Sequence, residues 1–249
     1  MDFSSFYTDT GSFKNYSSEH FIALFVVSVI GVIFIYFGKH KWNNKQKWRY
    51  ALYASAFLYF TQLFKLFIRM YLGNVDYTTD LPLHLCNFLP LLMFIGLYKR
   101  SRSLLAIISF WILAGTFQAN ITPTLTDVLP HYEAIRYWSI HTGLPVIVVY
   151  VFYVLGYRFT FRDAIKSALA LNVIAIIVYP INLLLGANYL FLIAKPPPGT
   201  IYDLLGPWPW YILSLEVIML VLFFITLIPF SIYLRFNPDK KPENITPSD

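Results

Sequence analysis

The side chains best suited to chemistry in this chain are one cysteine and two histidines. Cys86 is the single cysteine of the sequence, so an intramolecular disulfide is excluded. A free thiol is mostly protonated at neutral pH and becomes a good nucleophile beside a base or a cation. His84 and His141 are candidate bases, and Lys65 and Arg69 are candidate cations. These residue types predict nucleophilic catalysis by Cys86.

Helix geometry separates the roles of the two histidines. Asp80 or Thr79 would cap a helix that begins at Leu81. His84 and Cys86 are two residues apart, so they would lie about 200° apart around this helix. His141 belongs to another apolar segment and can face the thiol, so we predict it as the general base. His84 would then either bind substrate or hydrogen-bond to a residue that does. A zinc site from these three residues lacks a fourth ligand, and we expect neither metal nor cofactor; an inert buried cysteine is the non-functional alternative.

The elements that carry these residues are long apolar segments. Of 249 residues, 57% are hydrophobic and 13% are charged, whereas soluble domains carry roughly 25% charged residues. Blocks near the ~20 residues that span hydrocarbon lie at 19–38, 49–72, 81–98, 103–121, 137–157, 164–185 and 210–234. We therefore predict an all-α integral membrane protein with a bundle of about seven transmembrane helices.

Charge in the connections predicts the orientation of the bundle. Basic residues gather in every second connection, and the connections between them nearly lack bases. The positive-inside rule then places the N-terminus outside and the C-terminus in the cytoplasm. Residues 1–18 would be a flexible extracytoplasmic head, 19–234 the membrane domain and 235–249 a cytoplasmic tail. The formal net charge of +6 thus reflects topology rather than a nucleic-acid partner, and we expect a multi-pass protein of the plasma membrane.

Polar side chains inside six of the predicted helices share one level, in the outward half of the bundle. They include Gln62, Lys65, Arg69, His84, Cys86, Asn87, Gln118, Asn120, His141, Asn182 and Glu216. A charged group in hydrocarbon costs at least ~2.5 kcal/mol. We therefore expect Lys65, Arg69 and Glu216 to face one another or water, in a cavity open to the outer leaflet. Packing between helices is the non-functional alternative.

The connection 186–209 carries a second signal. Gly186-Ala187-Asn188-Tyr189 ends one predicted helix, and Gly206-Pro207-Trp208-Pro209-Trp210 leads into the last. Aromatic residues here suit a membrane interface. A rigid rim above the cavity, with Asn188 and Tyr189 against the substrate, is an equally good interpretation.

Leu81-Pro82-Leu83-His84-Leu85-Cys86-Asn87, together with the two motifs of that connection, resembles the YwaF-type family of bacterial integral membrane proteins. The resemblance runs from about the second predicted helix to the last. This family is similar to the animal transmembrane protein 164, an acyltransferase that remodels phospholipids through a cysteine-centred site. The resemblance implies that Cys86 accepts an acyl chain as a thioester and that a histidine, His141, assists.

The predicted function is a membrane-embedded lipid acyltransferase, or lipid acyl hydrolase, that works through a cysteine thioester on the outer-leaflet side. Membrane lipids would be its substrates. The predicted substrate-binding residues are His84, Asn87, Lys65, Arg69, Gln62, Gln118, Asn182, Asn188, Tyr189 and Glu216. A transporter or receptor for a small anionic or amphipathic ligand is the alternative, and a non-catalytic scaffold is a third. The pattern sets neither the acyl donor nor the oligomeric state.

Overall fold

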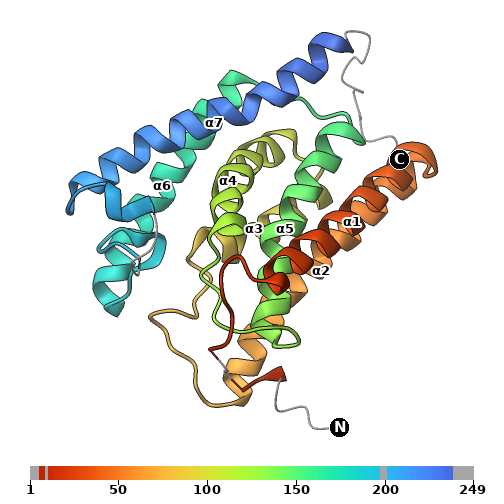
Figure 1. Ribbon diagram of the computed structural model, residues 1–249. Helices are drawn as coiled ribbons and strands as arrows, with labels where there is room; N and C mark the ends of the chain where they lie inside the picture. Colours follow the sequence, from red (N-terminus) through yellow and green to blue (C-terminus); the bar gives the residue numbers. More distant parts are fainter. Residues whose placement is uncertain (1–5, 9–10, 197–200, 238–249) are drawn as a thin grey trace.

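The protein is described by a computed structural model that covers residues 6–8, 11–196 and 201–237. This part of the chain is all-helical. The α-helices are α1 (Ser18–His40), α2 (Asn44–Tyr71), α3 (Leu85–Tyr98), α4 (Arg102–Ile121), α5 (Tyr132–Tyr153), α6 (Phe161–Leu185) and α7 (Trp210–Phe236). Two short 3-10 turns, η2 (Tyr189–Phe191) and η3 (Ile201–Leu204), precede α7. The predicted all-α bundle of about seven helices is confirmed (Figure 1).

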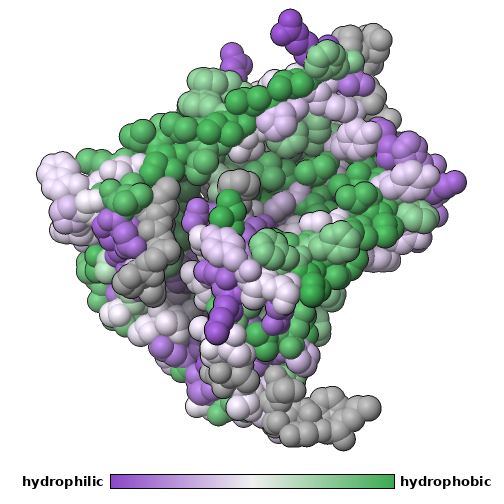
Figure 2. Space-filling model, viewed as in Figure 1, coloured by the Kyte–Doolittle hydropathy of each residue, from purple (hydrophilic) through white to green (hydrophobic). Residues whose placement is uncertain are grey.

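Six helices in the described part of the chain are long and apolar enough to cross a membrane; the exception is α3. With 14 residues, α3 rises about 21 Å, less than the ~30 Å of a hydrocarbon core. Hydrophobic side chains cover the exposed lengths of the helices, and hydrophilic ones gather toward the ends (Figure 2). So much exposed apolar surface marks an integral membrane protein. The orientation of the termini stays a prediction.

Helix α5 lies at the centre of the bundle. It packs against α1, α2 and α4, whereas α6 and α7 form a pair that contacts the other helices chiefly through α4 (Figure 1). Consecutive helices run in opposite directions, so the starts of α1, α3, α5 and α7 meet the ends of α2, α4 and α6. We call this the site end of the bundle. His20 Nε2 on α1 bonds the Asn120 carbonyl on α4 there at 2.9 Å.

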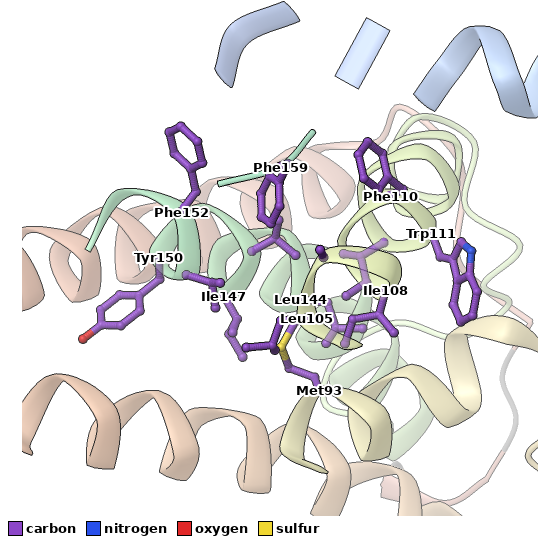
Figure 3. Packing of buried hydrophobic residues seen from close by; sticks show 14 of the residues in the cluster. Met93, Leu105, Ile108, Phe110, Trp111, Leu144, Ile147, Tyr150, Phe152 and Phe159 are labelled. Atoms are coloured by element: carbon purple, nitrogen blue, oxygen red, sulfur yellow. The ribbon is translucent and has the colours of Figure 1, made fainter. Parts of the chain in front are cut away.

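The apolar core lies between α3, α4 and α5. Met93, Leu105 and Leu144, one from each helix, are fully buried and meet there (Figure 3). Dispersion contacts in such a close-packed interior hold the three helices at fixed spacing. This core therefore fixes the start of α3 relative to α5, where the predicted thiol and base lie.

Helix α1 is held by close approach to α5. Gly31 and Gly38 face Val146 and Tyr150, and an added Cβ at either glycine would collide with those side chains. Small residues let helix backbones approach closely, which supplies packing energy inside a bilayer. The remaining faces of α1 are covered with exposed apolar side chains.

The predicted start of the third helix is wrong. The helix was expected from Leu81 with Asp80 or Thr79 as its cap, but α3 begins at Leu85 and its N-cap is His84. Asp80 is used elsewhere, because its Oδ2 accepts from the Asp76 backbone N–H at 2.9 Å. Cys86 therefore lies in the first turn of α3, where the helix dipole acts most strongly, and His84 precedes the helix rather than sharing it.

The predicted start of the fifth helix is also wrong, in the other direction. It was expected at Tyr137, but α5 begins at Tyr132, and His131 caps it by accepting from the Glu133 backbone N–H. Glu133 and Arg136 are thereby helical and stand on neighbouring turns. The predicted helices place both residues in the connection between 121 and 137, which is wrong.

The terminal segments are only partly described. Residues 1–5 and 9–10 of the predicted head, and 238–249 of the predicted tail, lie outside the described residues. Within the head, the Phe13 backbone N–H donates to the Thr126 carbonyl at 2.8 Å, and the Gly11 N–H donates to Asp127 Oδ1 at 3.1 Å. This part of the head lies along the connection between α4 and α5.

Candidate functional site

A chain of buried ion pairs crosses the site end. Lys65 Nζ on α2 lies 3.3 Å from Asp80 Oδ1 and 3.3 Å from Glu133 Oε1. Arg69 Nε lies 3.7 Å from Asp80 Oδ1, and Arg136 Nε lies 2.8 Å from Glu133 Oε2. Lys65 is only 9% exposed, so it does not snorkel to the surface. We call these five residues the charged chain; it joins α2, the segment before α3, and α5.

Arg136 connects the charged chain to the cysteine. Its Nη1 donates to Gln62 Oε1 at 3.1 Å and to Asn87 Oδ1 at 3.2 Å. The same Asn87 oxygen accepts from Cys86 Sγ at 3.8 Å. The charges of Arg136 and Lys65 lie close enough to act on the half-buried thiol. Burial is the largest influence on this thiol and raises its pKa, while the charges of Arg136 and Lys65 act in the opposite direction but more weakly. Cys86 at rest is therefore a protonated thiol that needs a base to become a nucleophile.

The hydrogen bonds of His141 define its tautomer. Nδ1 lies 2.9 Å from the Tyr137 carbonyl oxygen. A carbonyl oxygen only accepts, so Nδ1 carries the proton and Nε2 presents a lone pair. The ring lies against Tyr137, with centroids 4.1 Å apart. Among the described residues His141 makes no hydrogen bond to Cys86; the two share Tyr137 and Arg136 as electrostatic neighbours.

His84 has the opposite tautomer. Its Nδ1 accepts from the Leu190 backbone N–H at 3.4 Å, so the proton of the neutral ring is on Nε2. Burial, with a smaller contribution from the charge of Lys65, lowers the pKa of His84 to about 4. The ring is therefore neutral at pH 7 and can donate from Nε2. The free lone pair on Nε2 of His141 therefore suits a general base, and the proton on Nε2 of His84 suits a hydrogen-bond donor.

The predicted loop residues hold the segment before α3. The Tyr189 hydroxyl donates to the Tyr77 carbonyl at 2.8 Å and accepts from the Leu81 N–H at 3.1 Å. Asn182 bonds both the N–H and the carbonyl of Tyr189, each at 2.8 Å. Asn188 Oδ1 accepts from the Ile193 N–H at 3.1 Å. We call Asn182, Asn188, Tyr189 and His84 the neutral latch, since it ties residues 77–84 to the loop after α6.

Two predicted site residues lie apart from these groups. Gln118 Nε2 donates to Thr122 Oγ1 at the end of α4. Glu216 Oε2 on α7 accepts from Asn172 Nδ2 on α6 at 3.0 Å. The sequence predicts that Glu216 faces either Lys65 and Arg69 or water. The described residues do not show the first arrangement, because α7 contacts the bundle mainly through α4 and α6. The anions of the cluster are Asp80 and Glu133.

A groove of about 90 Å³ lies between α2 and α3. Its walls are mainly apolar, and its polar lining comes from three residues of the site. The lining residues are Tyr59, Gln62, Leu63, Leu66, Asp80, Pro82, Asn87, Phe88 and Leu91. Leu63 is 45% exposed on the membrane-facing side of α2. Asn87 stands between this groove and the thiol, since it lines one and bonds the other.

Sequence reasoning missed Asp80, Glu133 and Arg136 as site residues. Two buried cations on one face of a helix require anions, and Asp80 and Glu133 are acids at the same predicted level. That requirement could have identified both acids. The i, i+3 spacing of Glu133 and Arg136 is a helical signal that could have extended α5 backward. Within the described residues no group of three His, Cys, Asp or Glu side chains could hold a metal ion.

Comparison with known proteins gives one result. A sequence model of the TMEM164 family matches residues 15–227, which contain all seven apolar blocks except the end of the last. No curated protein and no solved structure matches the chain.

Proposed function

The chain belongs to the TMEM164 family, and on that premise we propose that it is a membrane-embedded lipid acyltransferase that works through a thioester on Cys86. The observation that carries the proposal is the place of Cys86 in the first turn of α3. There the thiol lies beside Arg136 and Asn87, and Asn87 lines a groove with apolar walls. An acyl chain would enter this groove laterally from the outer leaflet of the plasma membrane.

The first half-reaction transfers the acyl group to sulfur. The thiol proton passes to Nε2 of His141 while Sγ attacks the ester carbonyl carbon of a phospholipid. The C–S bond forms, the ester C–O bond breaks, and the imidazolium returns the proton to the leaving oxygen. The products are a lysophospholipid and a thioester. The lone pair on His141 Nε2, which follows from the Nδ1 bond to Tyr137, supports this role.

The second half-reaction regenerates the thiol. A hydroxyl of an acceptor lipid gives its proton to His141 and attacks the thioester, the C–S bond breaks, and the sulfur recovers the proton. Water in the same position would make the protein a hydrolase. His141 is 6% exposed and Asn87 is likewise buried, and exclusion of water from such a site favours transfer over hydrolysis.

Intact-protein mass spectrometry after incubation with mixed phospholipids tests the proposal. We expect the wild type to gain the mass of one acyl chain, which neutral hydroxylamine removes. Cys86→Ala should show no adduct, and His141→Gln should form it more slowly. Ser109→Ala removes a buried hydroxyl that bonds the Leu105 carbonyl within α4; it is the control and should behave as wild type. No adduct in the wild type under any lipid condition, or an unchanged adduct in Cys86→Ala, would overturn the proposal.

A transporter or receptor for a small anionic ligand is the second candidate. It is supported by Arg69, whose side chain is 27% exposed at one end of the charged chain. The apolar core between α3, α4 and α5 gives such a ligand no polar path through the bundle. Uptake by proteoliposomes that persists in Cys86→Ala would favour this candidate over acyl transfer.

A further inference from the structure

We infer that Arg136 is a positioning residue for the acyl-transfer step: by holding the oxygen of the Asn87 amide, it turns the amide nitrogen toward the α2–α3 groove to donate to the carbonyl oxygen of the lipid ester. The inference rests on the proposed function and adds a residue that the sequence had placed in a connection. It assigns the oxyanion donor to Asn87 rather than to Lys65 or Arg69.

The orientation of the Asn87 amide follows from its neighbours. A guanidinium only donates, so the Asn87 atom 3.2 Å from Arg136 Nη1 is the oxygen. The Cys86 thiol donates to that same atom. The amide nitrogen must therefore point away from both, and among the described residues it has no hydrogen-bond partner. Asn87 lines the groove and its amide nitrogen is not among the fully enclosed unpaired atoms of the described residues, so the N–H group is open to donate to a carbonyl oxygen in the groove.

Arg136 is itself held rigidly. Its Nε donates to Glu133 at 2.8 Å, and its Nη1 is shared between Gln62 and Asn87. Glu133 is in turn fixed by Lys65. The planar fork of arginine makes these bonds in fixed directions, which the single ammonium of a lysine does not reproduce. Among the residues of the charged chain, Arg136 is the one that makes a hydrogen bond to Asn87.

The arrangement fits the geometry of thioester formation. The carbonyl carbon must come within about 3–3.5 Å of the sulfur, and its oxygen needs donors at about 2.7–3.1 Å. Cys86 Sγ lies 3.8 Å from the oxygen of the same amide whose nitrogen is the proposed donor, so the thiol and the donor are close enough for one ester to contact both. The carbonyl oxygen becomes negative only during the attack, when the donated hydrogen bond strengthens.

The alternative is that Arg136 acts through its charge alone, by stabilising the thiolate. Two readouts separate the roles. Alkylation of Cys86 by iodoacetamide as a function of pH reports the thiolate. The rate of hydroxylamine-labile adduct formation from phospholipid vesicles reports attack on the ester. A charge-only role lowers both rates together, whereas a positioning role lowers the second far more.

The decisive variant is Arg136→Lys, which keeps the positive charge but loses the planar guanidinium with its N–H donors in fixed directions. We expect its alkylation profile to stay within about twofold of wild type and its adduct rate to fall by about tenfold or more. The matched control is Arg102→Lys, the same substitution in the bidentate Arg102–Asp163 pair at the opposite end of the bundle. Its adduct rate should stay within about twofold of wild type.

A second variant keeps the inference testable if Arg136→Lys fails to fold. Asn87→Asp preserves the acceptor for Arg136 and replaces the amide nitrogen by oxygen. Normalised to alkylation at the same pH, its adduct rate should fall about 100-fold. Wild-type adduct rates in either variant, or equal losses in both readouts, would overturn the inference while the proposed function stands. Absence of an adduct in the wild type overturns both.

Discussion

The segment that leads into α3 is held from two sides by different means. On the α2 side, the charged chain binds it through the ion pairs of the buried Asp80 with Lys65 and Arg69, and Lys65 continues the chain to Glu133 on α5. On the α6 side, the neutral latch binds it through uncharged side chains that bond backbone groups. The charged side also faces the thiol, whereas the neutral side holds the backbone. The difference separates electrostatic control of Cys86 from placement of its helix.

The largest expected effect comes from breaking the charged chain at its centre. Glu133→Ala leaves Lys65 and Arg136 each with one carboxylate fewer in a buried site. Removing one partner of a buried ion pair costs about 3–5 kcal/mol. Thermal unfolding of the detergent-solubilised protein, followed by size-exclusion chromatography, measures it. A melting temperature equal to that of wild type would mean that the ion pairs of Glu133 do not stabilise the bundle.

A smaller effect is expected when the shared cation is removed. Lys65→Met keeps the length of the side chain and leaves Asp80 paired with Arg69, and Glu133 paired with Arg136. Because neither carboxylate is stranded, we expect a loss of about 1.5–3 kcal/mol. The same unfolding assay checks the ranking. A larger loss than for Glu133→Ala would show that Lys65, not Glu133, is the centre of the charged chain.

Loosening the neutral latch should change access to the thiol more than global stability. Tyr189→Phe removes the hydroxyl that bonds Tyr77 and Leu81, at a cost of about 1–2 kcal/mol. We expect iodoacetamide to alkylate Cys86 faster, because residues 77–84 lose an anchor. Tyr150→Phe is the matched control, since its hydroxyl bonds the Lys47 carbonyl at the other end of the bundle. Equal alkylation rates in the two variants would contradict a role for the latch at the thiol.

The smallest expected effect is a pH dependence of the latch. His84 has a pKa of about 4 in the folded protein and about 6.5 when unfolded. Between these values the unfolded chain binds more protons, so stability falls as pH falls through this range. The loss between pH 6.5 and pH 5 should be on the order of 1 kcal/mol. His84→Asn, which can still accept from Leu190, should flatten the profile; an unchanged slope would exclude His84 as its source.

The fold could be predicted because a bilayer allows few solutions. Every apolar block of sufficient length had to become a helix, since backbone groups in hydrocarbon must be paired internally. The start of α3 could not be predicted in the same way. Asp80 has the residue type of a cap, but its side chain instead accepts from the Asp76 N–H and pairs with Lys65 and Arg69 on α2.

Part of the candidate site could also be predicted, because the positions of the helices could be. The level of Lys65, Cys86, Asn87 and His141 follows from helix direction and position. Their partners do not, because Glu133 and Arg136 are read as loop residues until α5 is known to begin at Tyr132. The hydrogen bonds of the neutral latch go to backbone groups, and its predicted contact with substrate stays a prediction.

The glycine-mediated contact of α1 with α5 has a consequence for how the protein is made. Gly31 and Val146 leave the ribosome about 100 residues apart, which at 5–20 residues per second is a delay on the order of 10 s. During that interval α1 sits in the bilayer without its main neighbour. Helix α1 must therefore remain in lipid until α5 has been synthesised.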